Sequence, residues 1–498
     1  MSEPYYITTA ISYPNGKPHI GHAYEAIAAD AMARFRRAQG RDVRLVTGTD
    51  EHGLKMAQTA RNAGVPTQAY ADEMSSYFRV MCDELNISYD VFVRTTEPRH
   101  AEASIALWEA MKSNGDLYLD RYEGWYSVRD EAFYDESELV EGEGDAKLSP
   151  QGTPVEWTTE ETWFFKLSAY QDRLLALYRD NPDFIRPESR RNEVMRFVEG
   201  GLKDLSVSRT SFDWGVPVPG SPGHVMYVWV DALTTYMTGV GFPDREGEFA
   251  RFWPADVHLI GKDIVRFHTV YWPAFLMSAS LPLPRQVFGH GFLLAKGEKM
   301  SKSLGNVVDP MALAERFGVD QLRYFLLREI HFGQDGSYSE EAIVNRLNAE
   351  LANSFGNLAQ RSLSMIFKNL DGIIPAPGEA GDDRVLLAEV DAACAELNVE
   401  FDKFSFSTGL DAWMRAVFAC NAYIDEQAPW ALKKTDPERM AAVLGTIVAA
   451  VRKLAIAVAP IVPASADRLT AFIDSGANGV AIGQPTPIFP RLEMSEDA

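Results

Sequence analysis

Two short stretches of this chain combine residue types that suit the binding of phosphate groups. In the first, His19 and His22 follow a turn over residues 13–18, and a β-rich run at residues 5–9 precedes that turn. Apolar residues then recur at helical spacing, so we predict a strand, a tight turn and the start of a helix. The first-turn N–H groups of such a helix bind anions, and the two histidines share one face. Gly21 between them lets a flat ligand approach the backbone, although a histidine pair alone is more often an ordinary surface feature.

The second stretch is Lys299-Met300-Ser301-Lys302-Ser303, followed by Leu304-Gly305-Asn306. Two lysines three residues apart, with hydroxyls and a glycine, suit a loop that closes on phosphates. A basic pentapeptide on its own is usually a solvated loop. Paired in this order with His19-Ile20-Gly21-His22 after a first strand, however, it resembles the class I aminoacyl-tRNA synthetases.

Composition limits the class of protein. The 498 residues, 46% hydrophobic and 24% charged, indicate a globular protein of two to four domains. We see no apolar run long enough for a membrane span and no room for a signal peptide before the first strand. Cys82, Cys394 and Cys420 are far apart, which argues against a disulfide framework and for a reducing cytoplasm. The net charge of −22 disfavours nucleic-acid binding unless the charges are segregated into patches.

The order of predicted elements divides the chain into four segments. Residues 1–114 alternate strands and helices, which predicts the first half of an α/β catalytic domain with a doubly wound, Rossmann-like parallel sheet. Residues 115–225 break the pattern and predict an inserted connective lobe. Residues 226–339 resume the sheet and carry the lysine loop. Residues 340–498 show no strand pattern and predict an all-α helix bundle.

Two predicted strands end in polar, glycine-containing turns. Residues 43–46 lead into the turn at 47–53, and the strand at 258–264 ends around Gly261. A third segment, 227–236, is expected to begin as a strand and to run into a helix. Open parallel sheets bind ligands at the carboxyl ends of their strands, so we expect binding residues in these places.

The predicted lobe is strongly acidic. Residues 120–161 contain thirteen Asp or Glu and three Lys or Arg, a local net charge of −10, which we interpret as a solvated face. We expect its small core to come from Trp125, Trp157, Trp163, Phe164 and Phe165.

Further motifs narrow the resemblance to one family. They lie, in chain order, at residues 10–16, 48–53, 227–232, 261–264, 299–303 and 421–430. Together they resemble the methionyl-tRNA synthetases over nearly the whole chain. The resemblance implies L-methionine, ATP with Mg²⁺, and initiator and elongator methionine tRNA as substrates, with methionyl-tRNA, AMP and pyrophosphate as products.

The residue types suit that chemistry. The methionine carboxylate is already an anion, so the protein needs only to align its attack on the α-phosphate and to stabilise the phosphate charge. His19 and His22 suit the ATP phosphates, and Lys299 and Lys302 suit the departing pyrophosphate. The resemblance places Gly21, Gly261 and Asp263 against ATP, and it implies a phosphate contact for Arg209. The alternative, equally favoured by the sequence, is that Arg209 is an ordinary surface arginine.

The amino-acid pocket also follows from the resemblance. Methionine is a flexible apolar chain with a weakly accepting sulfur, so its pocket needs apolar walls and one or two donors. Asp50 matches the carboxylate that pairs with the substrate ammonium. The other matching positions are Ile11, Tyr13, Val228, Trp229, Ala232, Leu233, Tyr236, Ile264 and His268. Without the resemblance, Val228, Trp229 and Ile264 would be plain core residues of strands.

The family's anticodon-contacting positions fall on Asn357, Arg361 and Trp430. Asn357 and Arg361 share a face of one predicted helix, and Trp430 follows Pro429 at a helix end. Unpaired bases are recognised by stacking on aromatic rings and by hydrogen bonds to their edges. The alternative is that Trp430 belongs to the core and that the other two merely pair with neighbours.

The sequence departs from many relatives in the lobe. Those carry Cys-x-x-Cys zinc knuckles, whereas residues 124–131 contain no cysteine, so we expect no structural zinc. We considered two alternatives: a synthetase for leucine, isoleucine or valine, which would need a larger editing insertion, and a catalytically dead tRNA-binding paralogue. We further expect a cytoplasmic monomer with no membrane contact.

Overall fold

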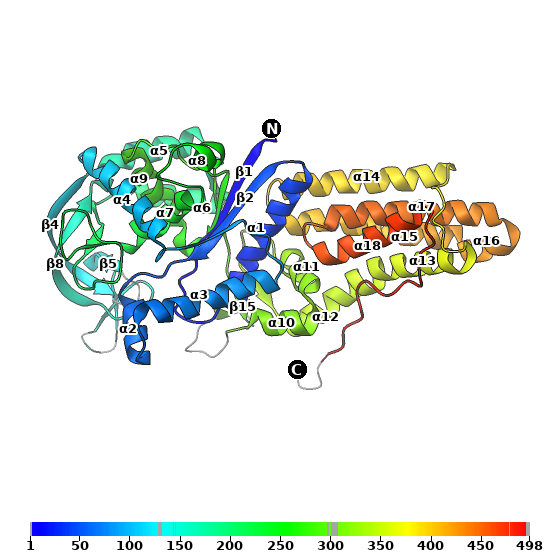
Figure 1. Ribbon diagram of the computed structural model, residues 1–498, viewed down its shortest axis with the longest axis horizontal. Helices are drawn as coiled ribbons and strands as arrows, with labels where there is room; N and C mark the ends of the chain where they lie inside the picture. Colours follow the sequence, from blue (N-terminus) through cyan, green and yellow to red (C-terminus); the bar gives the residue numbers. More distant parts are fainter. Residues whose placement is uncertain are drawn as a thin grey trace. The chain divides into compact units, whose positions relative to one another are not determined.

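The computed structural model describes residues 2–127, 132–142, 144, 146–295, 298–299, 307–477 and 479–494 (Figure 1). The chain forms two compact units that are not contiguous in sequence. The first comprises residues 1–18, 40–83 and 87–290, and the second comprises residues 19–39, 84–86 and 291–498. The helix that follows the first strand therefore belongs to the same unit as the C-terminal helices.

The first unit contains a six-stranded sheet in which every pairing is parallel, as the sequence predicts. The strand order is β3-β2-β1-β13-β14-β9. The strands are β1 (Pro4–Thr9), β2 (Asp42–Thr49), β3 (Val91–Arg94), β9 (Ile185–Arg186), β13 (Val257–Gly261) and β14 (Val287–His290). The chain proceeds from β1 through β2 to β3 on one side, and β13 and β14 lie on the other side. The order therefore reverses between β1 and β13, which is where doubly wound sheets bind ligands.

The helices of the first unit are α2 to α9. They are α2 (Leu54–Ala63), α3 (Thr67–Glu84), α4 (Pro98–Ser113), α5 (Gln171–Asp180), α6 (Glu188–Glu199), α7 (Val228–Thr238), α8 (Gly247–Phe252) and α9 (Trp272–Ser278). A five-residue π-helical turn, Phe267–Tyr271, leads into α9. Helices α4, α7 and α9 pack on one another beside the sheet, around the buried rings of Trp108 and Trp272 (Figure 1).

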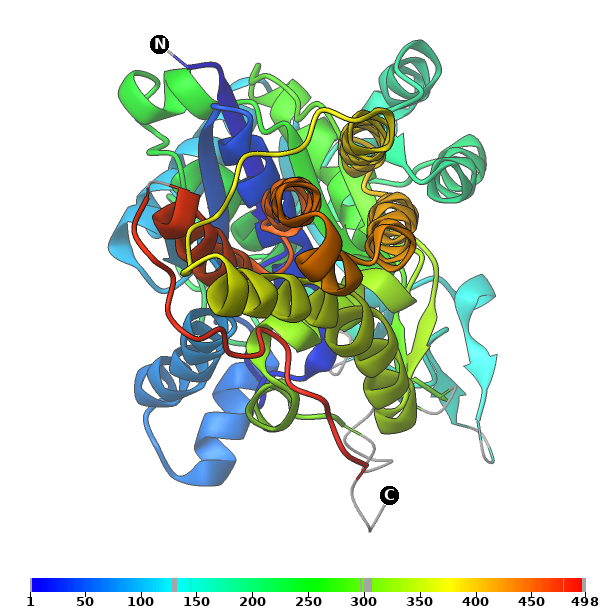
Figure 2. The same cartoon turned by 90° about the vertical axis from the view of Figure 1, so that its right-hand side faces the viewer.

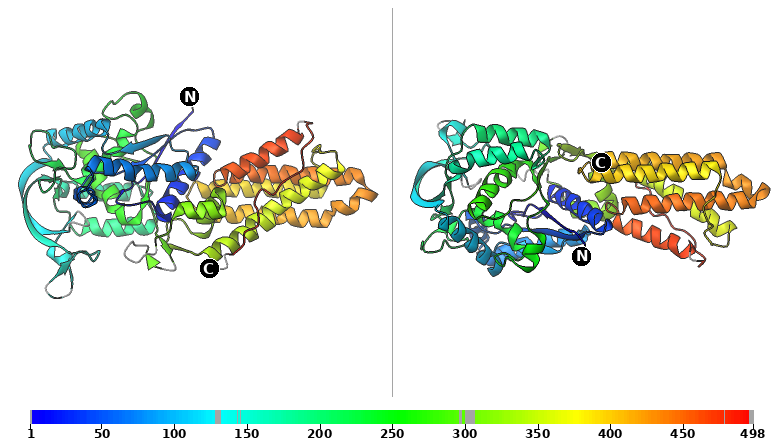
Figure 3. Two further views of the ribbon diagram at one scale, coloured as in Figure 1. Left: turned by 60° about the horizontal axis from the view of Figure 1, so that its bottom comes forward. Right: turned by 90° about the horizontal axis from the view of Figure 1, so that it is seen from above.

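The segment between α4 and α7 forms an antiparallel sheet of order β10-β8-β4-β5. Its long hairpin, β4 (Leu117–Ser127) and β8 (Glu156–Phe165), is the curved cyan ribbon of Figure 3. The shorter strands of this sheet are β5 (Ala132–Tyr134) and β10 (Leu205–Ser206). Two further two-stranded sheets pair β6 (Val140–Glu141) with β7 (Lys147–Leu148) and β11 (Ser208–Arg209) with β12 (Val225–Met226). Phe165 is buried here as expected, but the prediction for Trp157 was wrong. Its ring meets Trp125 edge to face and is 56% exposed.

The second unit begins with α1 (Ile20–Ala38) and continues after β14. A small sheet of order β16-β15-β17 comprises β15 (Leu293–Ala295), β16 (Glu298–Lys299) and β17 (Gly336–Tyr338). The successive strands β14 and β15 thus belong to different sheets. The helices α10 (Pro310–Phe317), α11 (Val319–Glu329) and α12 (Glu340–Leu347) complete this part.

The rest of the second unit is the predicted helix bundle, seen almost along several helix axes in Figure 2. A π-helical segment, Asn348–Gly356, joins α12 to α13 (Asn357–Asn369). The remaining helices are α14 (Gly381–Phe401), α15 (Phe406–Gln427), α16 (Pro429–Thr435), α17 (Pro437–Val458) and α18 (Pro463–Ala477). By length and composition α17 could cross a membrane, but 61% of its most apolar window is buried inside the protein, as in a core helix of a bundle.

A buried ion pair fixes α1 within the second unit. The Arg323 side chain on α11 is fully buried, and its Nη2 lies 2.6 Å from Asp30 Oδ2 on α1. The same guanidinium donates to the carbonyls of Ile461, at 2.8 Å, and Pro460, at 3.1 Å. Asp30 also accepts from Arg34 Nε at 2.8 Å. Because every charge in this cluster has a partner, its burial is tolerated.

We therefore predict that Arg323→Met destabilises the second unit by about 3 kcal/mol, because it leaves the buried Asp30 with Arg34 as its remaining charged partner and removes the donor to the carbonyls of Pro460 and Ile461. Urea unfolding followed by circular dichroism measures this loss. The control is Arg415→Met, which breaks the exposed pair with Glu396 and should cost less than about 1 kcal/mol. Equal shifts in the two variants would contradict the prediction.

Candidate active site

The turn after β2 carries the predicted ammonium partner. Asp50 is buried, and its backbone N–H donates to Ser12 O at 2.9 Å. Ser12 in turn donates to Gly48 O at 2.9 Å, so the segment after β1 lies against the end of β2. A Cβ on Gly48 would come within 1.9 Å of Val93 O, which explains why a glycine stands where β2 pairs closely with β3.

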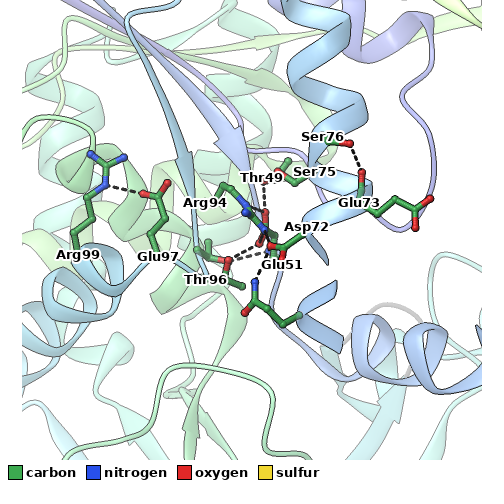
Figure 4. A network of polar contacts seen from close by, with 12 residues as sticks. Thr49, Glu51, Asp72, Glu73, Ser75, Ser76, Arg94, Thr96, Glu97 and Arg99 are labelled. Atoms are coloured by element: carbon green, nitrogen blue, oxygen red, sulfur yellow. Dashed lines mark hydrogen bonds and ion pairs between the residues drawn. The ribbon is translucent and has the colours of Figure 1, made fainter. Parts of the chain in front are cut away.

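The neighbour of Asp50, Glu51, is the centre of a polar network (Figure 4). Its two carboxylate oxygens accept from Arg94 Nε at 2.7 Å and from Arg94 Nη2 at 2.8 Å. The hydroxyls of Thr49 and Thr96 donate to the same carboxylate at 2.7 and 2.6 Å. Arg94 continues to Asp72 on α3 at 2.5 Å. Glu51 is fully buried, so this bidentate pair with two added donors satisfies a charge that would otherwise be costly.

The next residue, His52, enters a second buried network. His52 Nδ1 lies 2.6 Å from Asp231 Oδ2 on α7, and His100 Nε2 on α4 lies 2.6 Å from Asp231 Oδ1. Burial opposes ionisation of Asp231, but the charge of His52 and the hydrogen bonds from both histidines outweigh it and hold the pKa of Asp231 below its usual range. His52 and Asp231 lie within the motifs at 48–53 and 227–232, but the sequence predicted no role for either of them or for His100. The only signal was a polar run on α7, whose partners are 131 and 179 residues away.

Helix α7 carries most of the predicted pocket. The prediction of a strand at its start was wrong, because the helix begins at Val228, with Tyr227 preceding it as the N-cap. Ala232, Leu233 and Tyr236 are buried, and the Trp229 ring stacks on Phe267 with centroids 3.7 Å apart. The side chain of Val228 lies outside the described part of the chain.

His268 meets this helix from the π-helical turn. Its Nδ1 lies 2.9 Å from Ile264 O, and its Nε2 lies 2.6 Å from the Tyr236 hydroxyl. A carbonyl can only accept, so Nδ1 carries the proton and Nε2 accepts from Tyr236. Burial lowers the pKa of His268 to about 4, which keeps the ring neutral near pH 7. The Trp229 ring stands edge to face to it at 6.1 Å, so Trp229, Tyr236, Ile264 and His268 are brought together.

Ile11 and Tyr13 lie in the segment after β1. Both are half-buried, and the Tyr13 hydroxyl accepts from Met56 N at 3.0 Å on α2. Lys55 Nζ lies 5.9 Å from the centre of the Tyr13 ring. The ring is therefore held by the helix directly after the Asp50 turn.

In the second unit, His19 and His22 cap α1 reciprocally. Gly21 N donates to His19 Nδ1 at 3.0 Å, and His19 N donates to His22 Nδ1 at 3.1 Å. Each Nδ1 is thus an acceptor, which puts the ring proton on Nε2 and turns the ring's donor away from the helix. The rings are 3.9 Å apart, and a Cβ on Gly21 would come within 2.8 Å of His19 Cε1. Besides letting a ligand approach the backbone, the absence of a side chain at Gly21 therefore leaves room for the capping ring of His19.

Gly261 and Asp263 close β13. Gly261 ends the strand and is buried, whereas Asp263 is exposed in the following 3₁₀ turn. A Cβ on Gly261 would come within 2.7 Å of Asp263 Oδ1, so the glycine makes room for that carboxylate. Both residues lie at the carboxyl end of a strand beside β1, as the sequence predicts.

Arg209 is not an ordinary surface arginine, because it is only 2% exposed. Its Nη1 donates to Ser206 Oγ at 2.9 Å and to Ser208 O at 2.7 Å, and its guanidinium lies 4.5 Å from the centre of the Tyr227 ring. Arg209 therefore lies beside Tyr227, the N-cap of α7, and is held by contacts within the protein.

The lysine stretch is described only at its start. β16 pairs Lys299 with Leu294 of β15, so Lys299 lies on the returning strand of a hairpin. The side chain of Lys299 and the whole of Lys302 lie outside the described residues.

The predicted anticodon residues lie on the bundle. Trp430 is 51% exposed in the first turn of α16, directly after Pro429, so it is not a core residue. Asn357 is exposed at the start of α13. Arg361, one turn later, pairs with Asp425 at 3.0 Å.

Among the residues that the structure describes, no group of three or more His, Cys, Asp or Glu side chains is arranged to hold a metal ion. Residues 128–131 of the lobe are not among the described residues.

Comparison with known proteins assigns the family. Residues 5–363 match the family described as tRNA synthetases class I (M), and residues 374–481 match the anticodon binding domain of methionyl tRNA ligase. The methionine–tRNA ligase of Brucella suis biovar 1 is 57% identical, covering 99% of both chains, and that of Mycobacterium bovis is 56% identical, covering 99% of this chain and 98% of its own.

A solved structure agrees over the whole fold. Mycobacterium tuberculosis methionyl-tRNA synthetase in complex with methionyl-adenylate has a TM-score of 0.95 and 56% identity, covering 98% of this chain and all of its own. With its doubly wound parallel sheet and its C-terminal helical domain, this chain belongs to the methionyl-tRNA synthetase family of class I aminoacyl-tRNA ligases.

Proposed function

We propose that this protein is a methionine–tRNA ligase that activates L-methionine with ATP to methionyl-adenylate and transfers the methionyl group to the 3′ end of methionine tRNA. The single observation that carries the proposal is the aromatic cluster at α7, where we place the methionine pocket. Trp229, Tyr236 and His268 converge there, and the buried Asp50 turn is tied to the same helix through His52 and Asp231. Full-length relatives named methionine–tRNA ligase support the substrate, and a relative holding methionyl-adenylate supports the activation step.

In this proposal the pocket recognises methionine at both ends. The Asp50 carboxylate takes the ammonium group, because a buried carboxylate binds a cation with a charge-assisted hydrogen bond. Ile11, Tyr13, Val228, Ala232, Leu233 and Ile264 supply apolar walls with Trp229. The neutral His268 ring, oriented by Tyr236 and Ile264, lets the pocket accept an uncharged thioether.

The phosphate chemistry falls to His19, His22, Lys299, Lys302 and Arg209. The methionine carboxylate attacks the α-phosphate in line, a bond forms between carboxylate oxygen and phosphorus, and pyrophosphate leaves. The histidines' Nε2–H groups suit the phosphates of ATP, as does the positive end of α1. Gly21, Gly261 and Asp263 adjoin the nucleotide, and Mg²⁺ bound to ATP neutralises charge as the pyrophosphate departs.

We further propose a cytoplasmic monomer without structural zinc that binds initiator and elongator tRNA through its helix bundle. The proposal that zinc is absent rests on the lack of cysteine in residues 115–225. A ligase for leucine, isoleucine or valine is disfavoured by the identity of the relatives and by the short lobe between α4 and α7. Methionine-dependent ATP–pyrophosphate exchange tests the activity as a whole. No exchange with methionine would contradict it.

The first prediction concerns Asp50. Replacing it by Ala should raise the KM for methionine about tenfold to a hundredfold, because a charge-assisted contact of roughly 1.5–3 kcal/mol is lost. The KM for ATP should change little. ATP–pyrophosphate exchange with each substrate varied in turn measures both values. Asp204→Asn in the lobe is the control for loss of a carboxylate elsewhere, and equal weakening of both substrates by Asp50→Ala would count against the role.

The second prediction concerns Lys302. Lys302→Ala should slow adenylate formation by about two orders of magnitude or more while methionine binding stays nearly intact, because the phosphate charge it meets grows in the transition state. Single-turnover adenylate formation and equilibrium methionine binding separate the two effects. Lys403→Ala, which removes an exposed lysine paired with Glu400 just after α14, is the matched control. Loss of methionine affinity with an unchanged rate would refute this role.

The third prediction concerns Trp430. Base stacking is worth about 1–3 kcal/mol, so Trp430→Ala should lower tRNA charging roughly tenfold to a hundredfold while ATP–pyrophosphate exchange is nearly unchanged. Phe418→Ala removes another exposed ring of the bundle, 56% exposed on α15, and should leave charging unaltered. Parallel loss of both activities would mean that Trp430 supports the fold, and normal charging would mean that it does not touch the tRNA.

A further inference from the structure

Helix α7 is buried on two opposite faces, and the two faces differ in chemistry. Trp229, Ala232, Leu233 and Tyr236 recur at three- and four-residue spacing and form the pocket face. Asp231, Thr234, Thr235 and Thr238 recur at the same spacing on the other side, and all four are buried. Because the faces belong to one rigid helix, whatever fixes the polar face also sets the rotation of the pocket face.

Thr234 and Thr235 do little to fix that rotation, whereas the Thr238 hydroxyl also contacts His100 of α4. Thr234, Thr235 and Thr238 donate to the carbonyls of Val230, Ala232 and Thr234 within α7 itself, at 2.8, 2.6 and 3.1 Å. Asp231 differs, because both of its oxygens accept from other elements. His52 reaches it from the turn after β2, and His100 reaches it from α4.

The protons of this cluster can be assigned from geometry. A carboxylate accepts, so His52 Nδ1 and His100 Nε2 each carry a proton that points at Asp231. His100 Nδ1 lies 2.9 Å from Thr238 Oγ1, which ties the same ring to a second point on α7 one helical turn or more away. Ser104 Oγ lies 3.2 Å from His100 Nε2. The chain of contacts is thus directional, short and wholly buried.

His52 also belongs to the turn that holds Asp50. Gly53 N donates to Trp214 O at 3.1 Å, Trp214 Nε1 donates to Glu51 O at 2.7 Å, and the Trp214 ring meets His52 edge to face. The Glu51–Arg94 pair anchors this turn to β3 and α3, but not to α7. Within the described contacts, the direct polar tie between the turn and the pocket helix is His52–Asp231.

We propose that His52, Asp231 and His100 are positioning residues for methionine, holding the Asp50 carboxylate and the pocket face of α7 at a fixed separation and a fixed rotation. The inference rests on the proposed function, in which Asp50 binds the ammonium while α7 lines the side-chain pocket. The two ends of one small substrate are then gripped by different elements, so a shift between them of about 1 Å costs about a hundredfold in productive binding. None of the three residues needs to touch the substrate.

The test compares two substitutions of His52 that differ in where they place a donor. The amide nitrogen of Asn takes the place of Nδ1, the atom that contacts Asp231, whereas that of Gln takes the place of Nε2. We expect His52→Asn to keep the KM for methionine within about threefold of the parent. We expect His52→Gln and Asp231→Asn to raise it about tenfold or more. The KM for ATP should stay within about twofold in all three, as measured by ATP–pyrophosphate exchange.

Thermal unfolding of the same proteins separates positioning from stability. Ser278→Ala is the control, because it removes one buried hydrogen bond, to Asp116, at the far end of α9. It should lower the unfolding midpoint without changing the KM for methionine. Equal KM values for His52→Asn and His52→Gln, or a KM change in Ser278→Ala that matches its loss of stability, would overturn the inference.

Asp50→Ala, assayed alongside, separates this inference from the proposed function. If Asp50→Ala leaves methionine binding unchanged, the proposed role of Asp50 fails. If Asp50→Ala raises the KM and His52→Gln does not, the function stands and the positioning role is wrong.

Discussion

The parallel pairing of β1 with β2 on one side and β13 on the other is the constraint on which the rest of the first unit depends. Ile7 pairs with Leu45 in one direction and with Val257 in the other, so three strands end at the same edge. The pairing of these strands therefore fixes the positions of the turns that follow them. The Asp50 turn and the Gly261 turn come to that edge because the strands that precede them do.

Much of this arrangement can be predicted from sequence, because short β-rich runs that end in polar, glycine-containing turns are typical of strands followed by turns. The strand predicted at residues 5–9 is observed as β1 (Pro4–Thr9), and the parallel sheet predicted on the same grounds is observed too. The all-α C-terminal part was predicted from the lack of a strand pattern and is also observed. The start of α7 was not predicted correctly. Val228 and Trp229 are residue types that favour strands, but the helix begins there because tertiary packing overrides local propensity.

The burial of charged side chains was beyond prediction for a different reason. Arginine and aspartate side chains are usually found on the surface, whereas Arg209 and Asp231 are almost completely buried. Asp231 is enclosed because its partners His52 and His100 come from distant parts of the sequence, and Arg209 packs against the Tyr227 ring; no local pattern predicts either contact. The pocket residues were reached by resemblance, whereas the network behind them became visible only once β2, α4 and α7 were placed together.

Because α1 belongs to the second unit, the two units cannot be separated by cutting the chain at one point. Because Asp30 and Arg323 share a buried pair that also takes up the carbonyls of Pro460 and Ile461, residues from both ends of the chain form one cooperative body. No single cut in the polypeptide yields two self-sufficient fragments. A truncation before residue 460 would strip Arg323 of acceptors and expose the packing surface of α11. The module that can be exchanged between relatives is therefore discontinuous, and a chimaera must carry α1 together with the C-terminal helices.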